Sequence, residues 1–506
     1  MLPPQTPPRG QWQQRAMNAI GRVRGVTFPK WLTQYGVVTY ILALMAVTFM
    51  YSSYSMPWYY MLSGIVAIVV FYFYGSHLVE LTSPLKIRRE KNFEKRIFRI
   101  AFIPRILWMS LIYFIFMQNY GDAFGFEASD ARYYHDMGIF VADMISNGDY
   151  NFVDSIKHWN GGRGDISDMG YGIYVGFIYR IFGSEAGILA VRILKCVWST
   201  ITVVLVYRLA KRNFGEQTGR VATIFCALWP NFWYYSGCHL KETEMVFLSV
   251  LFVEQADQML RSRQFTAWKV APVLLIGASL LTLRTPLALV AFLSLIFSVV
   301  MSSQRVVSWG KRVIVGGLAL VLIGVTLGNQ IQEQASGLLG QVQSDQQEKN
   351  MEWRSQRTNG NAFAKYAGKS VFAPLIFTIP FPTMVQPFEG QEVQQLNNGG
   401  NFVKNIISGF TIFAMFMLLL SGKWREHLLP LSFMIGYLVV LTMSVFAQSE
   451  RFHQPCMPFE FMFAAYGLSI AVTKPKYKRW FMYWCGLMFV ACLVWSWFKL
   501  AGRGLA

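Results

Sequence analysis

Long apolar runs, separated by short basic turns, recur along almost the whole chain. Most of them approach the roughly 20 residues that an α-helix needs to cross a hydrocarbon layer about 30 Å thick. The pattern predicts an all-α polytopic membrane protein with about 13 transmembrane helices. We expect these helices near 31–54, 58–80, 104–118, 186–209, 217–236, 243–260, 269–283, 286–303, 312–329, 402–420, 428–447, 456–472 and 480–498.

The charges between the runs predict how the chain is oriented. Segment 84–105 carries eight lysines and arginines against two glutamates, so the positive-inside rule places it in the cytosol. Because two helices precede it, the N-terminus is expected in the cytosol as well. The third helix then carries the chain outward, which makes the polar segment that follows extracytoplasmic, and the later basic loops alternate consistently with this assignment.

The pattern therefore divides the chain into six parts. They are a cytosolic N-terminal tail (1–30), three transmembrane helices (31–118), a first extracytoplasmic loop with interfacial helices (119–185), central transmembrane helices (186–329), a second extracytoplasmic loop (330–401) and C-terminal transmembrane helices (402–506). Within the first loop, Tyr171–Phe182 is too short to span and is interrupted by Arg180, so we expect an interfacial helix that ends at Gly183. The N-terminal tail lacks the continuous apolar core of a cleavable signal peptide.

Composition supports the membrane assignment. Hydrophobic side chains make up 54% of the residues and charged ones only 14%, against roughly 25% charged in an average soluble protein. The net charge of +19 resides mainly in short loops, so it indicates topology rather than nucleic-acid binding. The cysteines mostly fall inside apolar runs and are expected to be buried, although a disulfide between Cys238 and Cys456 stays open.

The first extracytoplasmic loop is rich in carboxylates. Segment 119–169 contains nine of the 27 acidic residues of the chain. We expect most of them to be solvated, as loop carboxylates usually are. Asp130 differs because it follows the third helix closely and so lies where the phosphate of a membrane lipid would be. There it is a candidate general base toward a hydroxyl group.

Ionisable residues gather again at the outer ends of later helices. His239, Lys241 and Glu242 follow an aromatic cluster that begins at Trp229. Charged groups at such a boundary either snorkel to the surface or serve a function, and several together on the outer side favour a functional site.

Two arginines complete the candidate site. Arg284 interrupts a nearly continuous apolar stretch, and Arg451 and His453 precede a late helix. A guanidinium group suits bidentate binding of a phosphate, although Arg284 is equally compatible with a turn at a helix C-terminus. A carboxylate base with several cations at the same depth suits group transfer from a lipid phosphate.

Several segments together resemble the polyprenyl-phosphate-dependent membrane glycosyltransferases of the GT-C type, the clan of protein O-mannosyltransferases and the lipid A aminoarabinose transferase. The segments are DARYYHD (130–136), GYGIYVGFIYRIFG (170–183), VRILKCVWSTITVVLVYRLAKRNFG (191–215), LWPNFWYYSGCHLKET (228–243) and SERFHQPCMPFEFMFAAYGL (449–468). The resemblance implies a GT-C fold, with Asp130 as the catalytic carboxylate and Arg451 as a ligand of the donor phosphate.

Some members of that clan bind a divalent cation such as Mg²⁺ or Mn²⁺ through an acidic pair in the first loop. Here Asp130 is followed by Ala131, so the resemblance leaves a metal open, with Asp165 and Asp168 as substitutes for the missing partner.

The sequence thus predicts an inverting glycosyltransferase that moves a sugar from a polyprenyl-phosphate donor to a hydroxyl group of a glycan, lipid or protein. We expect Lys241, Arg284 and Arg451 to bind the phosphate and Asp168, His239, Glu242 and His453 to shape the pocket. The outer loops lack Asn-x-Ser/Thr sites, which suits a bacterial inner membrane. An O-antigen polymerase or ligase and a lipid-linked oligosaccharide flippase are the alternatives.

Overall fold

The computed structural model describes residues 28–50, 58–83, 89–125, 128–159, 167–262, 266–302, 392–443, 450–472 and 476–501, with single positions at 87, 310 and 317. Every regular element in these ranges is a helix. The elements are α2 (Lys30–Met50), α3 (Trp58–Val69), η2 (Val70–Tyr74), α4 (Gly75–Leu81), α5 (Glu90–Tyr120), α6 (Ala128–Ser146), α7 (Phe152–Trp159), α8 (Met169–Phe182), α9 (Ser184–Phe214), α10 (Glu216–Leu228), α11 (Pro230–Gly237), α12 (Glu242–Arg261), α13 (Ala267–Leu283), α14 (Thr285–Met301), α18 (Glu392–Leu420), η5 (Lys423–Glu426), α19 (Leu428–Met443), η6 (Glu450–Cys456), α20 (Met457–Ala471) and α21 (Lys476–Ala501).

Several of these helices have the length and apolarity of membrane spans. Five candidate spans, at Lys30–Met50, Gly64–Leu81, Glu90–Tyr120, Ser184–Phe214 and Phe402–Leu420, meet both criteria within the described ranges. This agrees with the predicted all-α membrane protein. The number of 13 spans stays a prediction, and both the span at 312–329 and most of the second loop (330–391) lie outside the described residues.

The third predicted helix is longer than its apolar run indicated. We expected a span at 104–118, but α5 begins at Glu90 and continues through the basic segment to Tyr120. The reason is a buried stripe that repeats about every four residues and includes Phe93, Ile97 and Arg105, as on one face of a helix. Arg105, which we had assigned to the cytosolic segment, is therefore fully buried, with its Nε donating to Ser199 Oγ at 2.8 Å.

The predicted span at 217–236 is not one continuous helix in the structure. It consists of two helices, α10 and α11. Trp229 separates α10 from α11 and has an extended backbone with ψ of 116°. The residue before a proline is sterically disfavoured in the helical region, and Pro230 follows here. The break redirects the chain just before the segment that contains Lys241 and Glu242.

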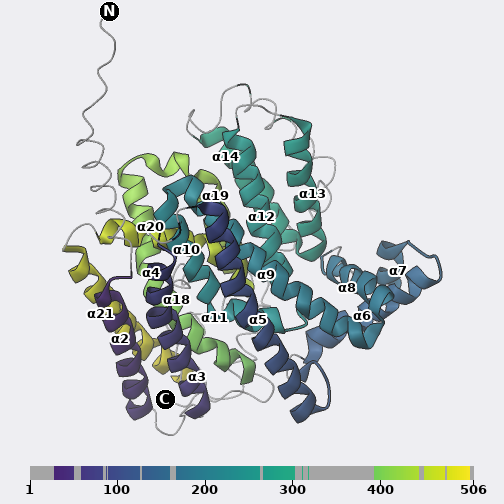
Figure 1. Cartoon of the computed structure of the whole chain (residues 1–506), viewed down its shortest axis with the longest axis horizontal. Coiled ribbons are helices and arrows are strands. Elements are labelled where there is room, and N and C mark those ends of the chain that lie inside the picture. Colours follow the sequence, from purple (N-terminus) through teal and green to yellow (C-terminus); the bar gives the residue numbers. More distant parts are fainter. Residues whose placement is uncertain are drawn as a thin grey trace, which may run out of the picture.

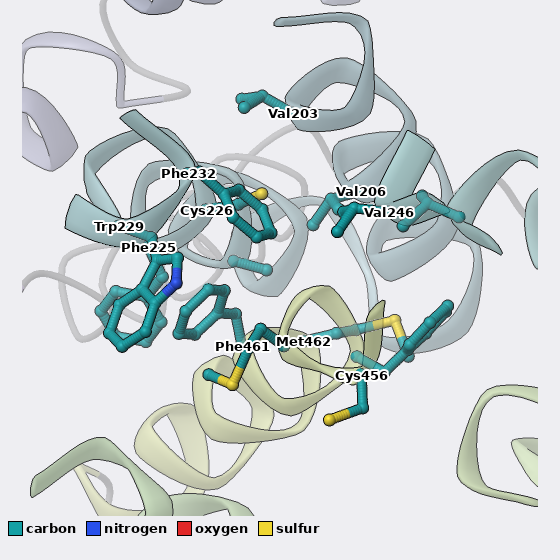
Figure 2. Packing of buried hydrophobic residues seen from close by; sticks show 14 of the residues in the cluster. Val203, Val206, Phe225, Cys226, Trp229, Phe232, Val246, Cys456, Phe461 and Met462 are labelled. Carbon is teal, nitrogen blue, oxygen red and sulfur yellow. The ribbon is translucent and has the colours of Figure 1, made fainter. Parts of the chain in front are cut away.

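The core lies where α9 and α10 meet α20, with α12 packed against α9. In Figure 2, Phe225, Trp229 and Phe461 pack at this contact between helices from distant parts of the chain. In Figure 1, α6, α7 and α8 lie together at one side of the helical body. The C-terminal helix α21 packs against α2.

Glycine residues allow α6 and α8 to approach each other closely. A Cβ atom at Gly172 or Gly176 of α8 would collide with Met137 or Val141 of α6, and one at Gly138 would collide with Val175. The helix α8 confirms the helix predicted at Tyr171–Phe182, and it ends at Gly183 as expected, where φ is 78°. This tight packing fixes Asp130, at the start of α6, relative to Asp168, at the start of α8.

Candidate active site

An ion-pair bridge joins three distant parts of the chain. Asp130 lies in the first turn of α6, and its Oδ2 accepts a hydrogen bond from Arg451 Nη1 of η6. The Nε of the same guanidinium group donates to Glu242 Oε1, at the start of α12. The Asp130 side chain is 51% exposed and that of Glu242 only 1%. Arg451 therefore links a solvent-accessible carboxylate to a buried one.

A second ion pair lies next to the first. Lys241 immediately precedes α12 and pairs with Asp168, which caps the start of α8 in a left-handed conformation with φ of 84°. Lys241 Nζ also donates to the carbonyl oxygen of Leu283 at 2.8 Å. These contacts connect the first loop to the junction between α13 and α14.

Arg284 stands at that junction, in extended backbone between α13 and α14. Its guanidinium carbon lies 4.0 Å from the centre of the Phe452 ring, and that of Arg451 lies 5.8 Å from the same ring. Stacking of guanidinium groups on an aromatic ring is favourable. Phe452 thus stacks against two arginines. Arg284 lies at a turn next to the C-terminus of α13, and its role as a phosphate ligand stays a prediction.

Burial and neighbouring charges tune the cations of this cluster. Burial lowers the pKa of Lys241 to about 7, with Arg284 and Arg451 contributing, although the carboxylates of Glu242 and Asp130 oppose the shift. Burial alone would also lower the pKa of Arg451, but Glu242 and Asp130 raise it above its ordinary value. Arg451 therefore stays charged, while Lys241 titrates near neutral pH.

His239 occupies a separate, aromatic part of the site. It is fully buried, and its Nε2 lies 3.4 Å from the hydroxyl oxygen of Tyr179, which is 2.8 Å from His135 Nδ1. Burial and the nearby cations Arg192 and Lys195 lower the pKa of His239 well below its ordinary value, so the imidazole is neutral. His453 is buried in η6, where its carbonyl oxygen accepts a hydrogen bond from the Cys456 thiol.

Sequence reasoning missed one buried ion pair that supports this cluster. Lys195 of α9 is fully buried and donates to Glu244 Oε2 at 2.7 Å and to the carbonyl oxygen of Leu240. It thereby holds the turn that contains Lys241 and Glu242. The available signal was a lysine inside an apolar predicted span, an expensive position unless the charge is paired.

Among the described residues, the carboxylates near Asp130 pair with cations instead of forming a ligand set for a divalent cation. Asp130 and Glu242 share Arg451, and Asp168 pairs with Lys241. Over the part of the chain that the structure describes, three potential metal ligands do not come together anywhere. Asp165 lies outside that part.

Comparison with known families supports the resemblance noted in the sequence. Residues 171–327 match the family described as dolichyl-phosphate-mannose-protein mannosyltransferase. The matched segment includes Lys241, Glu242 and Arg284, whereas Asp130 and Arg451 lie outside it. The match confirms the predicted GT-C resemblance and indicates a membrane glycosyltransferase. Neither a curated protein nor a solved structure matched the chain.

Proposed function

We propose that this membrane glycosyltransferase transfers a sugar, with inversion, from a polyprenyl-phosphate donor to a hydroxyl group of a glycan, lipid or protein. The observation that supports the proposal is the single cluster formed by the accessible carboxylates Asp130 and Asp168 and the cations Lys241, Arg284 and Arg451. A lipid phosphate needs such cations as it departs, and a hydroxyl acceptor needs a base.

In the proposed reaction, the acceptor oxygen attacks the anomeric carbon of the sugar from the side opposite the phosphate. Asp130 takes the proton of the acceptor hydroxyl as the new carbon–oxygen bond forms. The bond between the anomeric carbon and the phosphate oxygen breaks, and its electron pair leaves with the polyprenyl phosphate. Arg451, Arg284 and Lys241 stabilise the negative charge that grows on this leaving group.

Arg451 holds Asp130 and Glu242 at the same time. A donor phosphate competes for this guanidinium group, because a phosphate also accepts charge-assisted bidentate hydrogen bonds. Binding of the donor thus releases Asp130 to act as a base, while Glu242 keeps Arg451 oriented. In this scheme Asp168 orients Lys241 through their ion pair. His239 and His453 line the pocket in which the donor binds.

The proposal includes the place of the reaction. We put the active site on the extracytoplasmic face of a bacterial inner membrane, with the N-terminus in the cytosol, on the basis of the charge pattern of the loops. The apolar side chains that α5 exposes, such as Leu107, Leu111 and Phe114, suit contact with membrane lipids.

The decisive experiment follows release of lipid phosphate from labelled polyprenyl-phosphate sugars by the purified protein. Asp130→Asn should lower the turnover rate by about 100-fold to 10,000-fold, the usual contribution of a general base. Asp143→Asn, an exposed carboxylate on the same helix, is the matched control and should retain wild-type turnover. An Asp130→Asn protein as fast as wild type would exclude this mechanism and favour a ligase or polymerase that does not use Asp130.

A further inference from the structure

The first part of α5 presents basic side chains on its surface. Arg89, Lys91, Lys95, Arg96 and Arg99 are all exposed. Arg89, Arg96 and Arg99 share one face of the helix, because positions three or seven residues apart point in about the same direction. We call these three arginines the basic stripe; the two lysines flank it.

The carboxylates of the same helix do not neutralise the basic stripe. Glu90 pairs with Lys211, and Glu94 accepts hydrogen bonds from Arg208 Nε and Nη2 at 2.8 and 2.9 Å. Both partners belong to α9, so the two glutamates serve the contact between α5 and α9. Among the residues that the structure describes, neither the stripe nor its flanking lysines have a carboxylate partner. The charge of the stripe is therefore available to a partner outside the described chain.

Further along α5, the same face becomes apolar. Ile103, Leu107 and Phe114 follow the stripe and are 56%, 64% and 60% exposed. Large apolar side chains that are this exposed suit contact with the hydrocarbon of a bilayer. Leu107 comes eight residues after Arg99, which is about 12 Å at a rise of 1.5 Å per residue. One continuous helix thus places the cations just beyond the end of its lipid-facing surface.

That level of a membrane is occupied by phospholipid headgroups. Basic clusters next to a transmembrane helix attract anionic lipids, and each lysine or arginine near the surface contributes about fivefold in affinity. We infer that the basic stripe binds the headgroups of anionic phospholipids in the leaflet at the N-terminal end of α5. The bound headgroups hold this end of the helix at the membrane surface. The inference is independent of the proposed function.

The test counts the lipids that bind to delipidated full-length protein by native mass spectrometry. The probes are dioleoyl phosphatidylglycerol, which is anionic, and dioleoyl phosphatidylcholine, which has the same acyl chains and no net charge. At low ionic strength, wild type should prefer the anionic lipid by roughly 100-fold, because three cations each contribute about fivefold. The triple variant Arg89→Gln, Arg96→Gln, Arg99→Gln should lower this preference at least tenfold. The triple variant Arg89→Lys, Arg96→Lys, Arg99→Lys keeps the charges and should stay within about threefold of wild type.

A matched control removes three exposed cations elsewhere. Arg180→Gln, Lys423→Gln, Arg425→Gln changes the net charge equally and should also stay within about threefold of wild type. The single variant Arg99→Gln should lower the preference about fivefold, so the test does not depend on the folding of a triple variant. Wild type without a preference for the anionic lipid would overturn the inference. Equal losses in both glutamine triple variants would also overturn it, because net charge and not the stripe would then attract the lipid.

Discussion

The chemistry of Lys241 depends strongly on its surroundings. Burial lowers its pKa to about 7, while its ion pair with Asp168 favours the charged form. In the proposed function the charged amine attracts the donor phosphate, so we expect donor binding to be strongest at pH values below about 7. As the pH rises above 7, the amine loses its proton. The donor then binds more weakly, because the amine must first be protonated and this costs free energy.

This behaviour predicts an alkaline limb in the pH profile of kcat/KM, which reports groups of the free enzyme. Asp168→Asn removes the carboxylate that favours charged Lys241, so the limb should move to lower pH. The measurement is kcat/KM for a polyprenyl-phosphate sugar between about pH 6 and 9. Asp154→Asn, an exposed position on α7, should leave the limb in place. Superimposable profiles for wild type and Asp168→Asn would contradict this role of Asp168.

At the scale of elements, the site depends on how α9 holds the start of α12. Lys195 binds both Glu244 and the carbonyl oxygen of Leu240, on either side of Lys241 and Glu242. The same ammonium group lies 5.3 Å from the centre of the Tyr171 ring of α8. The buried Lys195 of α9 thus connects α9 with α8 and α12 next to the ionic cluster.

Removing only one partner of this buried pair should be worse than removing both. Lys195→Met leaves Glu244 as an unpaired buried charge and should destabilise the protein by about 3–5 kcal/mol. The double variant Lys195→Met with Glu244→Gln removes that charge and should recover part of the loss. Thermal unfolding in detergent is expected to give the highest Tm for wild type and the lowest for the single variant. A double variant that melts at or below the single variant would show that the charge itself is not the cause.

The extents of the elements show what an apolar pattern can and cannot predict. The helix predicted at Tyr171–Phe182 ended at Gly183 as expected, because only a glycine tolerates φ of 78° without strain. The predicted span at 104–118 lies inside α5, but the helix begins earlier, at Glu90, because its buried stripe continues past the apolar run. The break at Trp229 has a local cause, because Pro230 follows it. A prediction from the run of apolar residues alone does not take this proline into account.

At the scale of the whole molecule, orientation in the membrane is open to direct measurement. All six cysteines are buried and free, so a single introduced cysteine gives a clean labelling site. Asn151→Cys lies in the first loop and Lys95→Cys in the basic part of α5, and both positions are exposed. In intact cells, a membrane-impermeant maleimide should label Asn151→Cys and should reach Lys95→Cys only after permeabilisation. The reverse pattern would invert the proposed topology.

The members of the ionic cluster could be predicted from the sequence, but their pairing could not. Lys241, Arg284 and Arg451 each stand beside the end of an apolar run, and alternation of the helices brings such ends to one face. Which carboxylate meets which cation depends on the register between helices. The contact of α6 with α8, set by Gly172 and Gly176, is part of that register, and no local pattern of charges encodes it.

The bridge made by Arg451 also has a consequence for how the protein is made. Arg451 is 321 positions after Asp130 and 209 positions after Glu242. A ribosome therefore completes both carboxylate-bearing helix ends long before it reaches the arginine that joins them. Until η6 is synthesised, the nascent chain contains Glu242 but not Arg451, its ion-pair partner. Closure of the site is thus a late event in biogenesis, and a chain cut short before η6 would keep Asp130, the proposed base, but lose its ion-pair partner Arg451.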